Sequence, residues 1–365
     1  MTHRFIKEAC EELSKHPRNI GSLGADSAKT FIKEFAIKHN LPLGIEEVKI
    51  RKSPKTVLLK AKKLVNLNLL NDFKEPLEGK LLILETDRLR YITSLSEYIL
   101  ILLIKDIPDI DFYKDKINAL KPKAVVFVVE DFDISFYRMV FNYDMPVFSM
   151  AKKDLKYVED ITHISLTPSK EEQSVVENIY FDIGRGPVVY FIASISSRDD
   201  SHGSIYSASS VALSLGLAES FCKNYNSDFK FRFFFTEEDG SFDAVYKHLE
   251  KGQKYVYYAI SIFNAGWDNK ACFYEDAHGE NAIYMSDKFY KYAKSLNQSI
   301  YFLKSSTMSF LHAPFKDKDI KTLMFGSYPC TISNTLYDNA ESLRVEELYA
   351  WFEILSGFLR RFHAL

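Results

Sequence analysis

Three runs dominated by apolar and aromatic residues, each of strand length, stand in the second half of the chain. They cover residues 188–193, 229–235 and 255–262. Continuous apolar runs are typical of strands that are covered on both faces, whereas half-exposed strands alternate. Between the first two runs, apolar residues recur at helical spacing over residues 211–218. The pattern predicts a βαβ unit with the three runs as adjacent inner strands, and functional groups at their carboxyl ends.

The remaining pattern predicts helices and strands on both sides of this unit. The last helix is amphipathic and carries Leu348, Trp351 and Leu355 on one face. Helices are predicted over residues 3–15, 25–39, 282–296 and 344–362, and strands over residues 44–52, 56–65, 174–182 and 320–325. Helices and strands in this mixture favour a three-layer α/β/α sandwich around a mixed sheet.

A second group of strands interrupts this order. Residues 77–84, 120–129 and 145–150 are apolar and of strand length. They indicate a smaller inserted domain, α/β or β-rich, over residues 66–168, with residues 1–65 and 169–365 forming the main domain. An extension of the main sheet is the alternative.

Composition narrows the class of protein. The chain has 365 residues, of which 47% are hydrophobic, so it can bury a large core. A net charge of -2 gives no basic face, and we expect no nucleic-acid partner. The longest apolar run, residues 98–104, is too short to span a membrane. The N-terminus does not resemble a signal peptide and the four cysteines form no CxxC pair, so we expect a cytoplasmic protein.

The polar segments that follow the inner strands resemble a known family. They read Ala193-Ser-Ile-Ser-Ser197, Gly203-Ser-Ile-Tyr206-Ser-Ala-Ser-Ser210 and Glu237-Glu238. The di-zinc aminopeptidases, which include bacterial leucyl aminopeptidases, glutamate carboxypeptidase and the transferrin receptor ectodomain, have Ala-His-x-Asp-Ser, Gly-Ala-x-Asp-Asn-x-Ser-Gly and Glu-Glu at these places. The resemblance implies the α/β/α peptidase fold, and the inserted segment resembles a protease-associated domain.

The resemblance also implies where metal ligands would stand. The family uses a His, a bridging Asp, a Glu, a second Asp and a final His. The corresponding residues here are Ser194, Tyr206, Glu238, Phe263 and Asn334. Four of the five ligands are therefore replaced, and two replacements bring aromatic bulk. We expect these side chains to cluster without binding zinc, beside Glu237 at the position of the family's general base.

Two alternatives stay open at this site. One interpretation is a rebuilt metal site, formed by Asp199, Asp200 and His202 with His312 and the two glutamates. The other is a solvated loop in which these polar residues cap helices. Glu237 and Glu238 are either a vestigial base pair or carboxylates kept for capping or for a cationic group. We expect a raised pKa in at least one of the two, unless an Arg or Lys reaches in. No Gly-x-Ser-x-Gly elbow surrounds Ser194, which disfavours a serine hydrolase.

These observations predict an aminopeptidase-like protein that lacks a working di-metal centre and acts as a binding or interaction protein. The cleft residues would be Ser194, Tyr206, Glu238, Phe263, His312 and Asn334, with no cofactor and a peptide or protein as ligand. The alternative is a metal-dependent aminopeptidase with zinc in a rebuilt site. The sequence leaves the oligomeric state open, self-association included.

Overall fold

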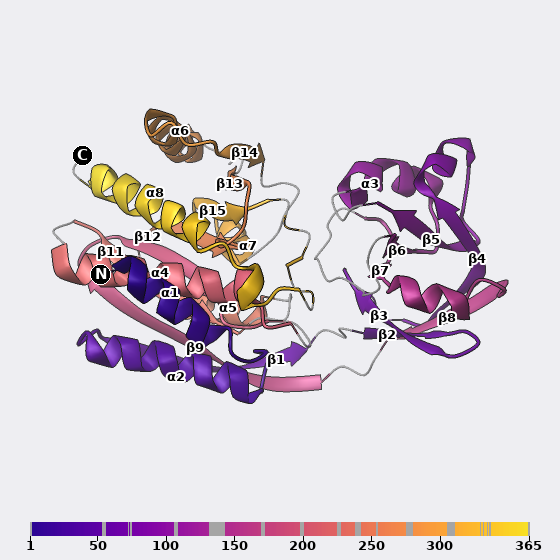
Figure 1. The fold of residues 1–365 in the computed structure, drawn as a ribbon, viewed down its shortest axis with the longest axis horizontal. Coiled ribbons are helices and arrows are strands. Elements are labelled where there is room, and N and C mark those ends of the chain that lie inside the picture. Colours follow the sequence, from indigo (N-terminus) through magenta and orange to yellow (C-terminus); the bar gives the residue numbers. More distant parts are fainter. Residues whose placement is uncertain are drawn as a thin grey trace. The chain divides into compact units, whose positions relative to one another are not determined.

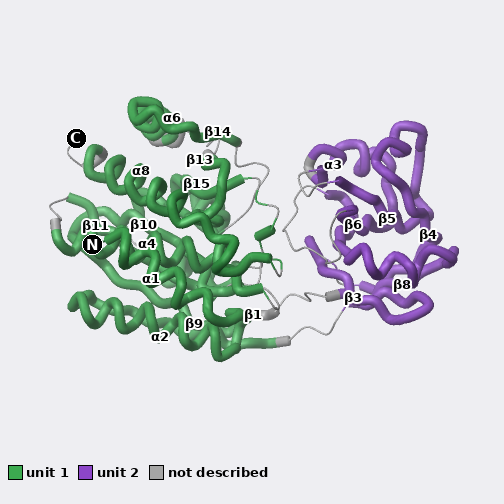
Figure 2. The backbone as a smooth tube through the Cα atoms, viewed as in Figure 1, with its two compact units in different colours: residues 1–51, 173–365 green, residues 52–172 purple. Residues whose placement is uncertain are grey.

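The computed structural model describes residues 2–363 except 53–55, 72, 74, 106–108, 131–142, 169–171, 198–200, 225–227, 238–241, 253–254, 275–279, 305–310, 329, 331, 334 and 336. The chain forms two compact units (Figure 2). Unit 1 comprises residues 1–51 and 173–365, and unit 2 comprises residues 52–172. Each is described by itself below.

Unit 1 is built on a mixed eight-stranded sheet, counted over the described residues (Figure 1). In spatial order its strands are β1 (Leu43–Lys52), β9 (Glu172–Gly184), β11 (Lys230–Thr236), β10 (Val188–Ser194), β12 (Val256–Phe263), β15 (Thr322–Ser327), β13 (Lys270–Tyr274) and β14 (Tyr301–Lys304).

The three strands predicted as adjacent inner strands lie side by side. β10 pairs in parallel with β11 on one side and with β12 on the other, so that Phe191 stands between Phe233 and Ile260. All seven residues of β10 are buried, because helices cover both faces of the sheet. The prediction from the apolar runs is confirmed. β9 and β13 run antiparallel to their neighbours β11 and β15, which makes the sheet mixed.

Helices cover the two faces of this sheet and complete the α/β/α sandwich. One face carries most of the core; the helices packed on it are α1 (Thr2–Leu13), α2 (Leu23–Lys38), α4 (Ser209–Asn224), α6 (Glu280–Ser295) and α8 (Val345–His363). The opposite face packs against α5 (Asp243–Glu250) and α7 (Ala313–Lys316). Figure 1 shows α1, α4 and α8 lying over the first face. The predicted α/β/α class is confirmed.

Helix α4 lies at the centre of that first layer. A side chain at Gly216 would fall on Ile6 of α1, so glycine at this position permits the close approach of the two helices. The segment Ser204–Lys223, which includes α4, is long and apolar enough to cross a membrane by composition alone. Within the described residues it is the one such helix, and 89% of its apolar window is buried inside the protein. That is the burial expected of a core helix.

A chain of buried polar groups crosses unit 1 on the α5 side of the sheet. The Tyr190 hydroxyl lies 3.1 Å from Nε2 of His248, whose Nδ1 lies 2.8 Å from the Glu46 carboxylate. Arg232 donates to the same hydroxyl at 3.2 Å and binds both oxygens of Asp182 at 2.7 and 2.9 Å. Burial is the largest influence on the pKa of His248 and lowers it, and the opposing charge of Glu46 does not offset this effect.

Unit 2 is a closed barrel whose strands follow the order β2-β3-β7-β6-β5-β4-β8. The helical segments of the unit are η1 (Thr86–Tyr91), α3 (Asp109–Leu120) and η2 (Lys152–Tyr157). Its strands are β2 (Thr56–Lys60), β3 (Leu64–Leu69), β4 (Leu77–Glu85), β5 (Tyr98–Ile104), β6 (Ala124–Val129), β7 (Val147–Ser149) and β8 (His163–Pro168).

The limits of unit 2 differ from the predicted insert, residues 66–168. The predicted single strand over residues 56–65 is a hairpin, in which β2 pairs with β3 and also with β8. Both strands therefore belong to the barrel, which begins at residue 52 and ends at residue 172. The apolar pattern of β2 and β3 carries no information on which sheet they join, because long-range pairing alone decides that.

Candidate functional site

Strands β10, β11 and β12 end at one edge of the sheet, because they run in parallel. Ser194 is the last residue of β10, Glu237 follows β11, and Phe263 is the last residue of β12. Each of the three side chains is 1% exposed. In α/β sheets, ligands bind beyond the carboxyl ends of the strands, so this edge is the candidate site.

Phe263 is packed into the apolar core on the α5 side of the sheet. Its ring centroid lies 5.7 Å from that of Phe273, and Met324 belongs to the same cluster. Tyr206, in the turn before α4, packs against this cluster as well. A side chain at Gly326 would fall on the Phe263 carbonyl oxygen, which shows how closely β15 approaches here. Two positions that correspond to carboxylate ligands in the resemblance therefore hold aromatic side chains in apolar packing.

The serines after β10 hydrogen-bond to the loop that they belong to. The Ser194 hydroxyl donates to the Ser196 carbonyl at 3.4 Å, and that of Ser197 donates to the Ser201 carbonyl at 2.7 Å. Ser197 also accepts a 2.7 Å bond from the backbone N–H of Arg18. A neutral hydroxyl that satisfies backbone carbonyls stabilises a loop and is a poor replacement for an imidazole ligand.

Glu237 is a buried carboxylate held by groups of the protein itself. Its Oε2 accepts from the backbone N–H of Glu177 at 3.1 Å and from Nζ of Lys29 at 3.3 Å. Lys29 also pairs with Asp26 at 2.8 Å. Burial lowers the pKa of Lys29, but its hydrogen bonds and charge interactions with Asp26 and Glu237 outweigh this and raise it. The other oxygen, Oε1, is buried and has no hydrogen-bond partner among the described residues. The residue that the sequence resemblance aligns with the family's general base is thus engaged through one of its two oxygens.

Arg18 connects the loop after β10 with the turn that leads into α4. Its buried guanidinium donates to the carbonyls of Ile195 at 2.9 Å, His202 at 2.8 Å and Gly203 at 3.0 Å, and to the Ser207 hydroxyl at 2.6 Å. It donates to the Leu13 carbonyl as well. Burial lowers the pKa of Arg18 to about 10, and the charge of Asp338 opposes that shift. Arg18 therefore stays charged at neutral pH and fixes the loop after β10 against the entry to α4.

Asp338 stabilises the start of α4 rather than lying free for a ligand. Its carboxylate accepts from the backbone N–H of Ile205 at 2.6 Å and of Tyr206 at 3.3 Å. These amides belong to a π turn, η3 (Ser204–Ala208), that leads directly into the helix. A negative charge at a helix N-terminus satisfies unpaired N–H groups and the helix dipole. After Asp338 the chain forms a short 3-10 turn, η5 (Ala340–Ser342).

The residues of the rebuilt-site alternative are only partly described. His202 is fixed through Nδ1, which lies 2.7 Å from the Ser14 carbonyl, and His312 is 2% exposed at the start of α7. Asp199, Asp200, Glu238 and Asn334 lie outside the described residues. Among the residues that are described, no three His, Cys, Asp or Glu side chains form a group that could hold a metal. The clustering of the five predicted ligand positions and the rebuilt site both stay predictions.

Three residues that shape the site were not assigned a role from the sequence. Arg18 stands in the segment His16-Pro-Arg-Asn-Ile-Gly-Ser-Leu-Gly24, which the sequence indicates only as a loop with glycine turns. Lys29 stands on a helix face where a charged residue is ordinary. Asp338 keeps a spacing seen in the family, which carried no role by itself. The one available signal for Arg18 was its place in a His-Pro-Arg-x-x-Gly-Ser segment, which resembles the opening of the family's chains.

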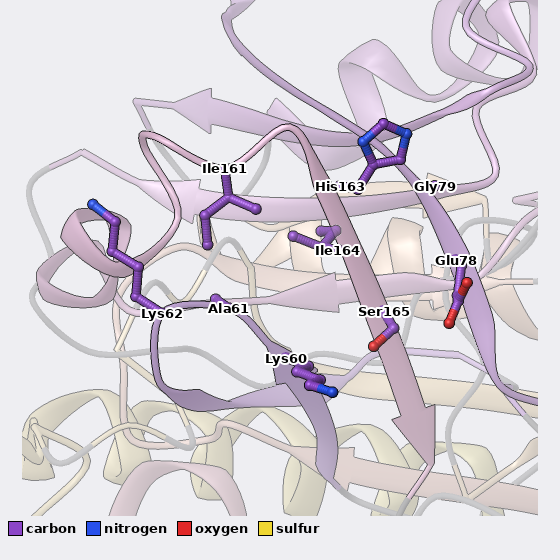
Figure 3. A pocket seen from close by; sticks show the side chains of 9 residues that line it. All are labelled: Lys60, Ala61, Lys62, Glu78, Gly79, Ile161, His163, Ile164 and Ser165. Carbon is purple, nitrogen blue, oxygen red and sulfur yellow. The ribbon is translucent and has the colours of Figure 1, made fainter.

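Unit 2 has a hollow of its own, of about 450 Å³, on the outside of the barrel. Lys60, Ser165 and Glu78 stand in one cross-strand row there, because β8 pairs with β2 and β4. Figure 3 shows Lys62 and His163 on the same side of this row. Lys62 pairs with Asp160 at the surface. The hollow is open and its charges are solvated, so it offers no fixed recognition geometry.

Unit 1 is an α/β/α sandwich with a barrel inserted after β1, and the fold is similar to that of solved M28 zinc aminopeptidases. A solved zinc aminopeptidase of Bacillus subtilis, BSAP, is 17% identical with a TM-score of 0.69, covering 98% of this chain and 94% of its own. The aminopeptidase of Aneurinibacillus sp. strain AM-1 is 14% identical with a TM-score of 0.66, covering 98% and 93%. The peptidase M28 precursor of Shewanella amazonensis SB2B is 13% identical with a TM-score of 0.63, covering 98% and 91%. No sequence family profile matches the chain, and no curated protein sequence does.

Zinc is the metal named for the Bacillus subtilis enzyme. Zn²⁺ is bound by thiolate, imidazole or carboxylate. Ser194, Tyr206 and Phe263, three of the positions that the sequence resemblance aligns with the family's ligands, offer none of these groups, and Phe263 packs in an apolar cluster. We derive no catalytic step through a metal.

Proposed function

We propose that this chain is a peptidase-fold protein without a working di-metal centre, and that it acts by binding a peptide or another protein. The observation that supports the proposal is the burial of Phe263 in an apolar cluster. The sequence resemblance aligns this residue with a carboxylate ligand of the family. An aromatic ring there fills space and supplies no charge. The fold alone does not imply hydrolysis, because function belongs to the site and not to the scaffold.

Peptide hydrolysis by this family requires an activated water and a group that stabilises the reacting carbonyl oxygen. A catalytic zinc lowers the pKa of its bound water from about 15.7 to about 7. A carboxylate facing ordinary water cannot replace that effect, and the Glu237 carboxylate is engaged by Lys29 and Glu177. A single hydrogen-bond donor to the reacting carbonyl is worth only about 3–4 kcal/mol. We therefore expect no aminopeptidase turnover that depends on these residues.

Two measurements on the purified full chain test the proposal. Elemental analysis after dialysis should show zinc far below one ion per chain. Hydrolysis of amino-acid anilides and short peptides, with and without added zinc or cobalt, should stay at background. Glu237→Gln should leave this background unchanged, as should Glu219→Gln, a matched buried glutamate that pairs with Lys223 on α4 instead.

The opposite result has a definite meaning. Stoichiometric zinc together with chelator-sensitive turnover that Glu237→Gln removes and Glu219→Gln keeps would refute the proposal. It would assign the activity to a rebuilt site drawn from Asp199, Asp200, His202, Glu237, Glu238 and His312. A cytoplasmic location, the absence of nucleic-acid and membrane partners, and self-association remain expectations from composition.

A further inference from the structure

A buried histidine of α5, His248, lies at the centre of a polar network that joins five elements of unit 1. Its imidazole and the neighbouring Tyr190 of β10 are each 0% exposed. The network consists of Glu46 on β1, His248 on α5, Tyr190 on β10, Arg232 on β11 and Asp182 on β9, and is called the His248 network below. None of its members belongs to the candidate site, so the candidate site does not explain it.

The donors and acceptors of the His248 network have one order while the imidazole is neutral. An ionised carboxylate only accepts, so Glu46 places the imidazole proton on Nδ1 of His248, 2.8 Å away. Nε2 is then an acceptor, and the Tyr190 hydroxyl donates to it at 3.1 Å. The oxygen of that hydroxyl accepts in turn from Arg232 at 3.2 Å. Each contact therefore has one donor and one acceptor.

A second proton on the imidazole, at Nε2, would break this order. The Tyr190 hydroxyl would face N–H groups from both His248 and Arg232, and its own proton would need a new acceptor. The described residues provide no other hydrogen-bond partner for this hydroxyl. A buried donor without an acceptor is unfavourable, because no hydrogen bond offsets the loss of its water.

The charges around His248 also favour the neutral imidazole. Glu46 is already shared with Lys251 at 3.6 Å, and Asp182 is engaged by Arg232. Burial lowers the pKa of His248 most, and the attraction of Glu46 does not offset burial and the positive charges of Arg232 and Lys251. The titratable and charged groups of the network and its immediate contacts are Glu46 of β1, Tyr180 and Asp182 of β9, Tyr190 of β10, Lys230 and Arg232 of β11, and Lys251 directly after α5.

Helix α5 is the element whose opening exposes His248 with the least disruption. It has eight residues, so its separation from the sheet breaks fewer contacts than unfolding of unit 1. Its contacts with β1 include the Glu46 pair and a hydrogen bond from Lys247 to a β1 carbonyl. Tyr246, two residues before His248 and so on the opposite side of the helix, contacts Asp317 instead of the network. Opening of α5 would therefore hydrate the imidazole and release β1 together.

We propose that the His248 network is a pH switch, which holds α5 and β1 on the sheet at neutral pH and loosens both when acid protonates His248. The two segments have defined places in the chain. In the sequence, α5 starts six residues after Glu237 of the candidate site, and β1 is the last strand before unit 2. The inference depends on neither metal content nor peptide binding, so its test is separate from that of the proposed function.

Hydrogen exchange of the full chain, followed by mass spectrometry at about pH 7.5 and about pH 5.5, tests the switch. Rates are corrected for the pH dependence of unprotected amides. An open form in which the imidazole has its ordinary pKa of 6.5 gains up to about tenfold in population over this range. Protection of residues 43–52 and 243–250 should therefore fall by about threefold to tenfold, and that of α8 should change by less than about twofold.

Two variants remove the titrating group and keep part of the network. His248→Gln retains an acceptor near Tyr190, His248→Asn retains a donor near Glu46, and neither side chain takes up a proton in this range. Both should lose the acid response of α5 and β1. His39→Gln is the matched control and should keep it, because burial also lowers the pKa of His39, which lies at the end of α2. Unchanged protection of α5 in acid, equal loosening throughout unit 1, or a response that persists in both His248 variants would overturn the proposal.

Discussion

Replacing Phe263 by aspartate restores the residue type of the family at a position that this chain uses for apolar packing. Phe263 is 1% exposed, its ring lies 5.7 Å from that of Phe273, and β15 approaches closely at Gly326. Truncating a buried Phe costs about 3–5 kcal/mol of unfolding free energy. The new carboxyl group adds desolvation, about 1–3 kcal/mol by mutational data even when it stays protonated. We expect Phe263→Asp to lose about 4–8 kcal/mol of unfolding free energy.

Thermal unfolding makes this loss measurable. Unit 1 has roughly 240 residues, and a unit of that size loses about 2–4 °C of Tm per kcal/mol. Phe263→Asp should therefore lower the Tm of unit 1 by about 8–32 °C, or prevent folding at growth temperature. Phe263→Leu keeps most of the apolar volume and should lower it by only a few degrees. Near-ultraviolet circular dichroism, with chelator and with excess zinc, gives both the size of the shift and its response to metal.

Phe273→Asp is the matched control, because Phe273 is 1% exposed in the same cluster and does not correspond to a family ligand. Packing alone predicts that both aspartate variants lose similar stability and that zinc restores neither. If zinc raises the Tm of Phe263→Asp and leaves that of Phe273→Asp unchanged, the new aspartate completes a metal site whose other ligands are already present. A Tm for Phe263→Asp within a few degrees of that for Phe263→Leu would equally refute the packing argument.

Three further predictions concern the buried polar groups and the tight approach at β15. Folding lowers the pKa of His248, so the imidazole of the unfolded chain takes up a proton at higher pH than that of the folded chain. The free energy of unfolding should therefore fall as the pH drops below about 6.5. Urea denaturation at a series of pH values should show this fall, and His248→Gln should reduce it. Arg18→Met should lower the free energy of unfolding by about 3–5 kcal/mol in denaturant titration. Arg18→Lys should be similarly destabilised, because one ammonium cannot reach the five acceptors that the guanidinium contacts. Gly326→Ala should lower the Tm of unit 1 by several degrees in calorimetry, since its methyl group would fall on the Phe263 carbonyl.

Sequence alone determined the inner strands and the fold class. The run at β10 is buried over its full length, and those at β11 and β12 are dominated by aromatic and aliphatic residues, although β11 also carries Lys230 and Arg232. Strands of that composition favour positions where both faces are covered. The helix and strand order around them then leaves few arrangements, of which the α/β/α sandwich is one. Local periodicity carries this information, so no distant contact is needed to predict it.

Tertiary structure decided the boundary of unit 2 and the roles of the polar residues. The β2–β3 hairpin joins the barrel through pairing with β8, more than a hundred residues later, and no local pattern records that choice. Arg18, Lys29 and Asp338 gain their roles from partners far along the chain, in the loop after β10, at Glu237 and at the start of α4. A charged side chain looks the same in sequence whether it is solvated or buried. Only the folded chain decides which ones lose water and must be paired.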